Sequence, residues 1–233
     1  AVDVLAEFPP LKTSGDTTWL MLVAHYDSRY ESHLPEGPVL SYGAADDGYG
    51  VAVILETVSQ LLKKRDEWKQ GVKVLFTDAE EAGMMGMESI WNNDRYVFDN
   101  TGLMINVEAR GTYGPALLFE TSPGNEKLLD LYAYADYPFT YSLTTIVYGF
   151  LPNFSDFTIV KDELPGMNFS TVADINHYHT DLDCFENISL KTVQHYGEQI
   201  HPVAEKYLTD AVYSDKEYLR AEKNYIPNIT RLR

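Results

Sequence analysis

The order of apolar runs along the chain predicts an α/β protein: a three-layer α/β/α sandwich around a central mixed, mostly parallel sheet. Strand-like runs alternate with helical patterns along most of the 233 residues, which is typical of βαβ units. The runs KVLFT (73–77) and LMINV (103–107) are mostly apolar, as in strands that are buried on both faces. The apolar fraction of 45% supplies enough side chains for a large core.

Six strands and four helices are expected. Each strand is a short apolar or β-branched run bounded by Gly, Pro, Asp or Asn. The expected strands are 2–8, 18–24, 72–77, 103–107, 116–119 and 166–169. The clearest helix begins near Gly48, because apolar residues recur at helical spacing from Val51 to Leu62. The other expected helices are 87–92, 125–134 and 189 to about 211. The segment FPPLKTSGD, residues 8–16, reads as a hairpin connection.

We expect residues 1–233 to form one domain, because single cores grow to roughly 250 residues before chains divide. The chain begins directly on the strand-like run VDVLAEF without an initiating Met, so we expect it to be part of a longer protein. No apolar run approaches the roughly 18 residues that a membrane-spanning helix requires.

Charge and cysteine content exclude some functions. The formal net charge is -17, from 35 acidic and 18 basic residues, and such a surface repels nucleic acid. Part of this excess can instead be carboxylates that hold cations. Cys184 is the single cysteine, which excludes an internal disulfide and a thiolate metal cluster.

Acidic residues and histidines gather just after the predicted strands and before the long helix. In open α/β sheets ligands bind beyond the carboxyl ends of the strands, so these positions are candidates for a site. The clusters are His25 and Asp27, Asp46 and Asp47, Glu80 and Glu81, Glu108, and His179. Each cluster alone has an ordinary structural explanation, such as a turn, a helix N-cap or the acidic first turn of a helix.

The clusters together predict bound cations. Burying several carboxylates costs several kcal/mol for each uncompensated charge. Only Arg29 and Arg110 are interleaved with these clusters, and two cations are too few to balance them. Two imidazoles with carboxylates form a ligand set that zinc accepts without thiolates. Two metal ions account for both the number and the sign of these groups.

Five motifs resemble those of one enzyme family. AHYDS, GAADDGYG, FTDAEEAGMMG, NVEARG and YHTDLD occur in this order between residues 24 and 183. They closely resemble the motifs of co-catalytic di-zinc aminopeptidases, a family that includes bacterial secreted aminopeptidases, glutamate carboxypeptidases and the vacuolar membrane protease type. The resemblance covers most of the chain and implies a single zinc peptidase catalytic domain.

The resemblance also implies roles for individual residues. The two zinc ions would be bound by His25, Asp46, Glu81, Glu108 and His179. Asp46 would bridge both ions, and Asp47 would follow it across a cis peptide bond. Glu80 would be the general base. Asp27 would orient His25, a role that the His-x-Asp spacing also suits because a ligating imidazole needs its other N–H fixed. Many relatives have Asp in place of Glu108.

Substrate recognition is predicted less directly. We expect peptide substrates with a free N-terminus, whose amino group docks near the second metal and its acidic ligands. The segment 137–157 contributes Tyr148, Phe150 and Phe154 as candidate pocket walls, although core packing explains such aromatics equally well. Arg110 is a candidate ligand for a substrate carboxylate or a partner for a neighbouring acid. His177 is interpreted as a surface histidine or a partner of the site rather than a metal ligand.

Three functions compete at this point. The first is an aminopeptidase or a related exopeptidase. The second is a glutaminyl cyclase, which shares the fold but uses one zinc and transfers an acyl group within its substrate. The third is a non-catalytic receptor-like domain that has lost its metal ligands. The Asp46-Asp47-Gly48 sequence favours hydrolysis, and the persistence of all five ligand positions argues against a receptor. Relatives are mostly secreted, lumenal or membrane-tethered, so we expect a location outside the cytoplasm.

Overall fold

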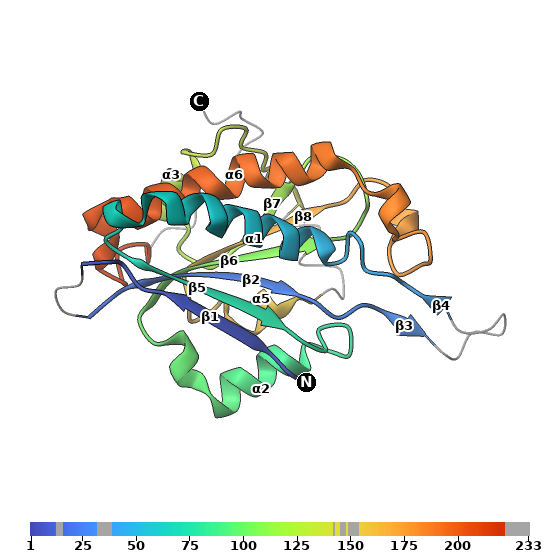
Figure 1. The fold of residues 1–233 in the computed structure, drawn as a ribbon, viewed down its shortest axis with the longest axis horizontal. Coiled ribbons are helices and arrows are strands. Elements are labelled where there is room, and N and C mark those ends of the chain that lie inside the picture. The colour runs from blue at the N-terminus through green and yellow to red at the C-terminus, as the bar shows by residue number, and fades with distance from the viewer. Residues whose placement is uncertain (13–15, 32–38, 142, 145–147, 149–153, 222–233) are drawn as a thin grey trace.

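A six-stranded sheet between two helical layers forms the centre of the computed structural model (Figure 1). The structure describes residues 1–12, 16–31, 39–141, 143–144, 148 and 154–221. The strands of the central sheet are β1 (Val4–Phe8), β2 (Trp19–His25), β5 (Gly71–Thr77), β6 (Thr101–Ala109), β7 (Leu117–Thr121) and β8 (Gly166–Thr171). A separate two-stranded sheet contains β3 (Tyr30–Glu31) and β4 (Val39–Leu40).

The strand order in the large sheet is β1-β5-β2-β6-β8-β7. The four central strands run parallel, and each edge strand is antiparallel to its neighbour. The predicted mixed, mostly parallel sheet is therefore confirmed. The hairpin expected at 8–16 is wrong, because β5 lies between β1 and β2 and pairs with both. The local turn residues in this segment carry no information about which strand β1 pairs with.

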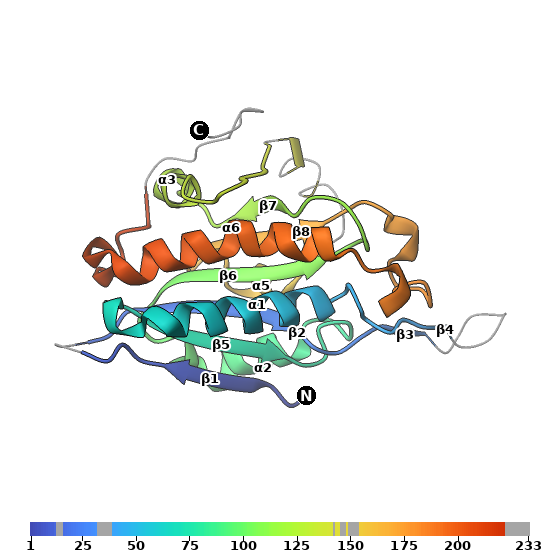
Figure 2. The ribbon, with the colours of Figure 1, turned by 45° about the horizontal axis from the view of Figure 1, so that its top comes forward.

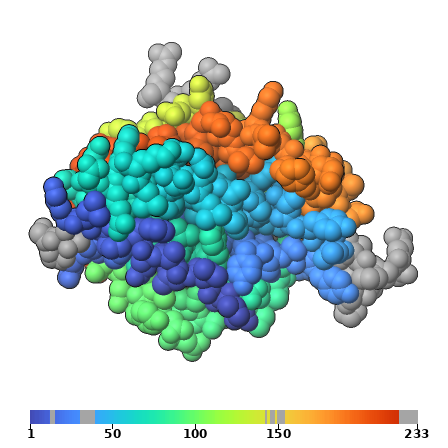
Figure 3. Space-filling view, viewed as in Figure 1, coloured from blue at the N-terminus to red at the C-terminus, as the bar shows by residue number. Residues whose placement is uncertain are grey.

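Helices cover both faces of the sheet, as Figures 1 and 2 show. One layer contains α1 (Gly48–Leu61), α3 (Glu126–Tyr132) and α6 (Leu190–Thr209). The opposite layer contains α2 (Met85–Asn93) and α5 (Asp156–Val160). The predicted three-layer sandwich is confirmed. In the space-filling view α1 and α6 lie side by side over the sheet (Figure 3).

Alternation of side chains along the strands produces one apolar core on each face. On β2, Leu20, Leu22 and Ala24 belong to the cluster under α1 and α6, whereas Met21 and Val23 belong to the cluster under α2 and α5. Successive strand residues point to opposite faces, so a strand buried on both faces needs apolar residues at nearly every position. This explains why the central strands read as continuous apolar runs.

Short 3-10 helices connect the main elements. They are η1 (Leu62–Glu67), η2 (Arg95–Phe98), η3 (Ile175–His177), η4 (Phe185–Asn187) and η5 (Ala211–Ser214). In the described part of the chain, no helix is both long enough and apolar enough to span a bilayer.

The start of α1 lies directly beside the predicted site. The carboxylate of Asp47 accepts a hydrogen bond of 3.1 Å from the Gly50 N–H and caps the helix. The peptide bond between Asp46 and Asp47 is cis, as the family resemblance implied. The helix begins at Gly48, directly after the acidic pair, and holds this pair at the end of the sheet.

Candidate metal centre

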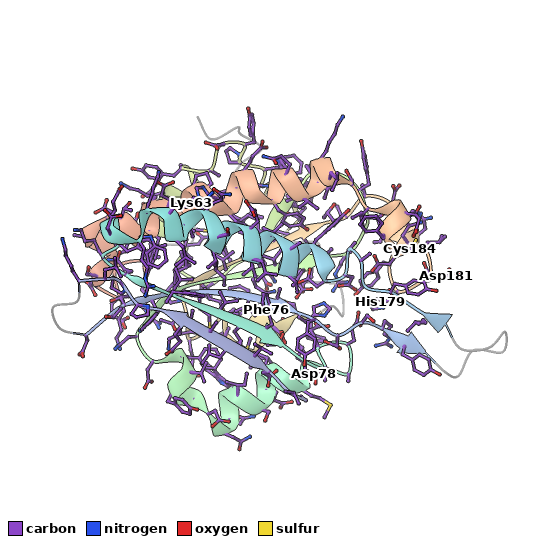
Figure 4. The ribbon with its side chains drawn as sticks, viewed as in Figure 1. Lys63, Phe76, Asp78, His179, Asp181 and Cys184 are labelled. Atoms are coloured by element: carbon purple, nitrogen blue, oxygen red, sulfur yellow. The ribbon has the colours of Figure 1, made fainter. Side chains whose placement is uncertain are left out.

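Residues far apart in the sequence meet at the carboxyl edge of the parallel strands. His25 is the last residue of β2, Glu80 and Glu81 follow β5, and Glu108 is near the end of β6. Asp46 precedes α1, and His179 lies between β8 and α6, on the loop labelled in Figure 4. Parallel strands end at the same edge of a sheet, which explains how these segments converge.

The first group of donors contains His25, Asp46 and Glu108. The His25 Nε2 atom lies 3.1 Å from Asp46 Oδ1 and 3.8 Å from Glu108 Oε2. One ligand atom from each of the three residues lies within 4.8 Å of the others. All three residues are buried, so bulk water does not solvate their charges.

The second group contains Asp46, Glu81 and His179. The His179 Nε2 atom lies 2.9 Å from Glu81 Oε1 and 3.3 Å from Asp46 Oδ2. Asp46 belongs to both groups, with Oδ1 towards His25 and Oδ2 towards His179. Glu80 also lies close, because one of its carboxylate oxygens is within 4.8 Å of ligand atoms of His25 and Glu81. A carboxylate between two imidazoles is suited to bridging two cations.

The hydrogen bonding of these atoms fits a metal site. Asp46 Oδ2, Glu81 Oε1 and His179 Nε2 are buried and make no hydrogen bond of correct geometry with any residue that the structure describes, although they lie close together. Buried polar atoms without a partner are rare in folded proteins, and a bound ion is one explanation. Arg29 supplies one positive charge, with Nη1 3.8 Å from Glu81 Oε2. The nitrogen and oxygen donor set suits divalent zinc.

Burial changes the pKa values of these groups in the direction expected for a site that needs cations. Burial raises the pKa of Glu80 to about 9 and that of Glu108 to about 8, because an isolated carboxylate is poorly solvated there. Burial lowers the pKa of His179, but Asp46 and Glu81 outweigh it and raise the value to about 9. Without a metal the groups are neutralised by protons, so metal binding would displace protons.

Asp27 connects two parts of the site. The His25 Nδ1 atom lies 3.1 Å from the main-chain oxygen of Asp27 and 3.4 Å from its carboxylate. The same carboxylate accepts hydrogen bonds from the N–H groups of Glu80 (3.0 Å) and Glu81 (3.2 Å). Asp27 therefore lies where it can orient the imidazole and also holds the turn after β5, a second role that the sequence did not suggest.

Asp183 is a positioning residue that sequence reasoning missed. Its carboxylate accepts hydrogen bonds from the N–H groups of Ala45 (2.6 Å) and Asp46 (3.2 Å) and from the Ser41 hydroxyl (3.3 Å). These bonds fix the backbone that presents Asp46. The last residue of the YHTDLD motif was visible in the sequence, but its partners are more than 130 residues away.

A buried polar network also reaches Glu108. Asn106 Nδ2 donates to Glu108 Oε1 (3.0 Å) and to Asn168 Oδ1 (3.0 Å). Asn168 Nδ2 in turn donates to Glu120 Oε2 (3.1 Å), and Lys161 Nζ lies 2.6 Å from Glu120 Oε1. One oxygen of Glu108 is thus held by an amide while the other faces His25. Neither asparagine was predicted, because asparagines in apolar strands show no pattern.

The predicted substrate residues do not all lie together. Arg110 and Tyr148 line one apolar pocket. Phe154 is exposed and is not among the side chains that line this pocket. Phe150 lies outside the described residues. His177 shares a hydrogen bond of 2.7 Å with the Thr112 hydroxyl and is not among the residues of the donor groups.

The fold and the donor set define an α/β domain with a candidate metal centre at the carboxyl edge of its sheet. Residues 3–204 match the profile of Peptidase family M28, and the chain belongs to that family. Its fold is the α/β fold of the zinc aminopeptidases. Membership of this family makes the domain a metallopeptidase by class.

Known relatives cover most of this chain. It is 30% identical over 185 residues to endoplasmic reticulum metallopeptidase 1 of Rattus norvegicus, which matches 76% of this chain; the chain spans 20% of the length of that relative. Among solved structures, a zinc aminopeptidase from Bacillus subtilis matches with a TM-score of 0.64, 18% identity and coverage of 92% of this chain and 52% of that one. Porphyromonas gingivalis glutaminyl cyclase matches with a TM-score of 0.66, 18% identity, and coverage of 88% and 77% respectively.

Proposed function

We propose that this domain binds two zinc ions and acts as an exopeptidase of the aminopeptidase type, which removes the N-terminal residue of peptides. The observation that carries the proposal is the position of Asp46, whose two carboxylate oxygens face two separate groups of donors. His25 and Glu108 would complete the first metal site, and Glu81 and His179 the second. A single-zinc enzyme has no need for a buried carboxylate shared in this way.

Glu80 is the proposed general base. When bound, the two zinc ions would supply Lewis acidity, which makes water nucleophilic near neutral pH and polarises the scissile carbonyl group. The Glu80 carboxylate accepts the proton of the attacking water and passes it to the leaving amine. In the metal-free site burial raises the pKa of Glu80 to about 9, and the positive charge of two bound zinc ions would lower it and keep the carboxylate ionised as a base.

The substrate and the location are part of the same proposal. Asp46 and Glu81 belong to the second donor group, and their carboxylates would attract a free α-amino group of the substrate. This selects peptides with an unblocked N-terminus.

The names of relatives such as endoplasmic reticulum metallopeptidase 1 support a lumenal or membrane-associated location for the protein that contains this domain.

Two substrates test the proposal against its alternatives. The zinc-loaded protein is incubated with an aminoacyl chromogenic amide and with a peptide that begins with glutamine, each before and after chelation. We expect release of the chromogenic amine that chelation abolishes. Pyroglutamate formation without amide hydrolysis would instead support a glutaminyl cyclase, for which the likeness to the Porphyromonas gingivalis enzyme is the favouring observation. Turnover of neither substrate would support a receptor-like domain.

A further inference from the structure

An apolar pocket lies beside the candidate metal centre. The cavity has a volume of about 290 Å³, close to the lower end of the range of ligand pockets. Two of its lining residues lie next to the predicted metal ligand Glu108. Ser170 is the register partner of Glu108 across β6 and β8, and Arg110 lies two residues beyond Glu108. The pocket therefore begins where a substrate bound at the metal centre would extend.

The walls of this pocket are mostly apolar. Leu117, Phe119 and Tyr148 form part of the lining, with the rings of Phe119 and Tyr148 packed edge to face at 4.7 Å between centroids. The hydroxyl group of Tyr148 is buried and makes no hydrogen bond within the described residues. Such a surface suits the hydrocarbon part of a ligand, while its few polar groups determine which ligand binds.

Arg110 is the charged residue of the pocket wall. Its Cζ atom lies 5.4 Å from the ring centroid of Tyr178 and 6.0 Å from that of Tyr148. Tyr178 in turn stacks on His179, with 3.6 Å between ring centroids. The guanidinium group is thus held by aromatic faces at the side of the pocket that adjoins the second donor group. Cation–π contacts use the face of the guanidinium plane and leave its N–H groups available.

Arg110 has no acidic partner in the part of the chain that the structure describes, where it makes neither an ion pair nor a side-chain hydrogen bond. By contrast, Arg29, Arg95 and Arg220 each lie within 4.0 Å of a carboxylate oxygen. A half-buried cation without a counter-ion beside an apolar pocket is unusual in a domain with a net charge of -17. An anionic group of a ligand would complete the arrangement, because arginine binds carboxylates through two parallel hydrogen bonds.

We propose that this pocket binds the portion of the substrate that carries a carboxylate, and that Arg110 pairs with that carboxylate. The inference rests on the proposed peptidase function and specifies its substrate class. Two parts of a peptide offer this chemistry: an acidic side chain on the N-terminal residue, and the C-terminal carboxylate of a dipeptide. The apolar walls of the pocket suit the methylene groups of an acidic side chain, and they also suit an apolar side chain of a dipeptide.

Matched pairs of substrates test the inference. One pair is the glutamyl and glutaminyl anilides, which differ in the charge of the side chain. The other is leucyl-phenylalanine and its C-terminal amide, which differ in the charge of the terminus. The measured quantity is the ratio of kcat/KM for the charged substrate to that for its neutral partner. We expect the wild-type protein to favour the charged member of one pair. The pair that shows this preference identifies whether the carboxylate comes from the side chain or from the C-terminus.

Replacement of Arg110 should remove that preference. In Arg110→Met the ratio should fall by about 10- to 100-fold, the range for losing a hydrogen-bonded charged group, and Arg110→Lys should retain part of it. Arg95→Met is the control, because Arg95 packs on Trp91 and pairs with Glu163, outside the pocket. That variant should keep the wild-type ratio.

The failures of the two proposals are distinguishable. If the wild-type protein hydrolyses the neutral substrates but shows no preference within either pair, the assignment of Arg110 is overturned and the peptidase function stands. The assignment is also overturned if a preference exists and survives in Arg110→Met. Hydrolysis of none of the four substrates would overturn the peptidase proposal, and the carboxylate assignment with it.

Discussion

Two buried groups of acids lie on the same sheet and are neutralised in different ways. In the network that includes Glu120, one carboxylate oxygen pairs with Lys161 Nζ at 2.6 Å and the other accepts from Asn168 at 3.1 Å. In the candidate metal centre, Asp46 Oδ2 and Glu81 Oε1 make no hydrogen bond within the described part of the chain. The chain provides a lysine for the first group and leaves the second short of positive charge.

The difference shows how a functional cluster can be separated from a structural one. A buried acid that the protein keeps for packing has its partners within the chain, because an unpaired buried charge costs several kcal/mol. A buried acid whose oxygens face other acids and imidazoles lacks such partners. Glu108 belongs to both groups, since Asn106 holds one of its oxygens and the other faces His25. The structural network therefore positions a residue of the metal centre.

The largest expected effect is on catalysis at the metal centre. Glu80→Gln should lower kcat by about 10²- to 10⁴-fold, because the amide cannot accept the proton of the attacking water. Zinc content should stay at the wild-type value, which elemental analysis of the purified variant checks. Glu88→Gln, the same change at an exposed position on α2, is the control. Near-wild-type turnover in Glu80→Gln would remove this residue from the mechanism.

The second effect is the pH dependence of the metal-free protein. The folded-state pKa values of Glu80 (about 9) and Glu108 (about 8) lie above those of the unfolded chain. Their stabilising contribution is therefore complete below the unfolded pKa of about 4.3 and is lost as pH rises through about 8 to 9. Between pH 6 and 8 the free energy of unfolding should fall by about 1.4 kcal/mol per pH unit for each retained proton.

Chemical denaturation of chelated and zinc-loaded protein checks this slope. Zinc replaces the protons, so the zinc-loaded protein should show a much smaller dependence over the same range. Equal slopes for the two forms would mean that zinc does not displace protons from these carboxyl groups.

The third effect is on the zinc affinity, which should depend on Asp183 but not on a neighbouring acid. Asp183→Asn should weaken zinc binding by about 10- to 100-fold, because the amide accepts fewer of the three hydrogen bonds that hold Ser41, Ala45 and Asp46. Competition with a zinc-binding dye measures the affinity. Asp181→Asn alters an exposed acid on the same loop and should leave the affinity unchanged. Equal affinities for both variants would limit Asp183 to a structural role.

The smallest effect is in the structural network. Lys161→Met should lower the free energy of unfolding by about 1–3 kcal/mol, because it leaves the buried Glu120 carboxylate without its cation. The double variant with Glu120→Gln should recover most of that loss, because the charge is then absent as well. Urea denaturation of both variants measures the difference. If the double variant is less stable than Lys161→Met, the lysine does not act by neutralising Glu120.

Much of the fold could be predicted from the sequence, because periodicity reports directly on burial. Every strand and helix that was expected is present, with ends that differ by a few residues. Helix α5 was missed, since five residues from Asp156 to Val160 are too few to show a helical repeat. The strand order could not be predicted, because the apolar residues of β1 do not specify a neighbour.

The residues of the candidate site could likewise be predicted only in part. His25, Asp46, Glu81, Glu108 and His179 were nominated by their positions after strands and by the order of the family motifs, and the structure brings their ligand atoms together. Asp183 and the Asn106–Asn168 pair were not found, because their roles consist of hydrogen bonds to residues distant in the sequence. Asp27 was found because it lies two residues from the histidine that it orients, whereas residues that hold distant parts of the chain leave no such local pattern.

The number of zinc ions per folded chain tests the central claim most directly. The protein is dialysed against buffered zinc, and bound metal is counted by elemental analysis for the wild type and for Asp46→Asn. Two ions per wild-type chain, and fewer in the variant, are expected if Asp46 joins two sites. A wild-type chain that saturates with one ion or none would contradict the account.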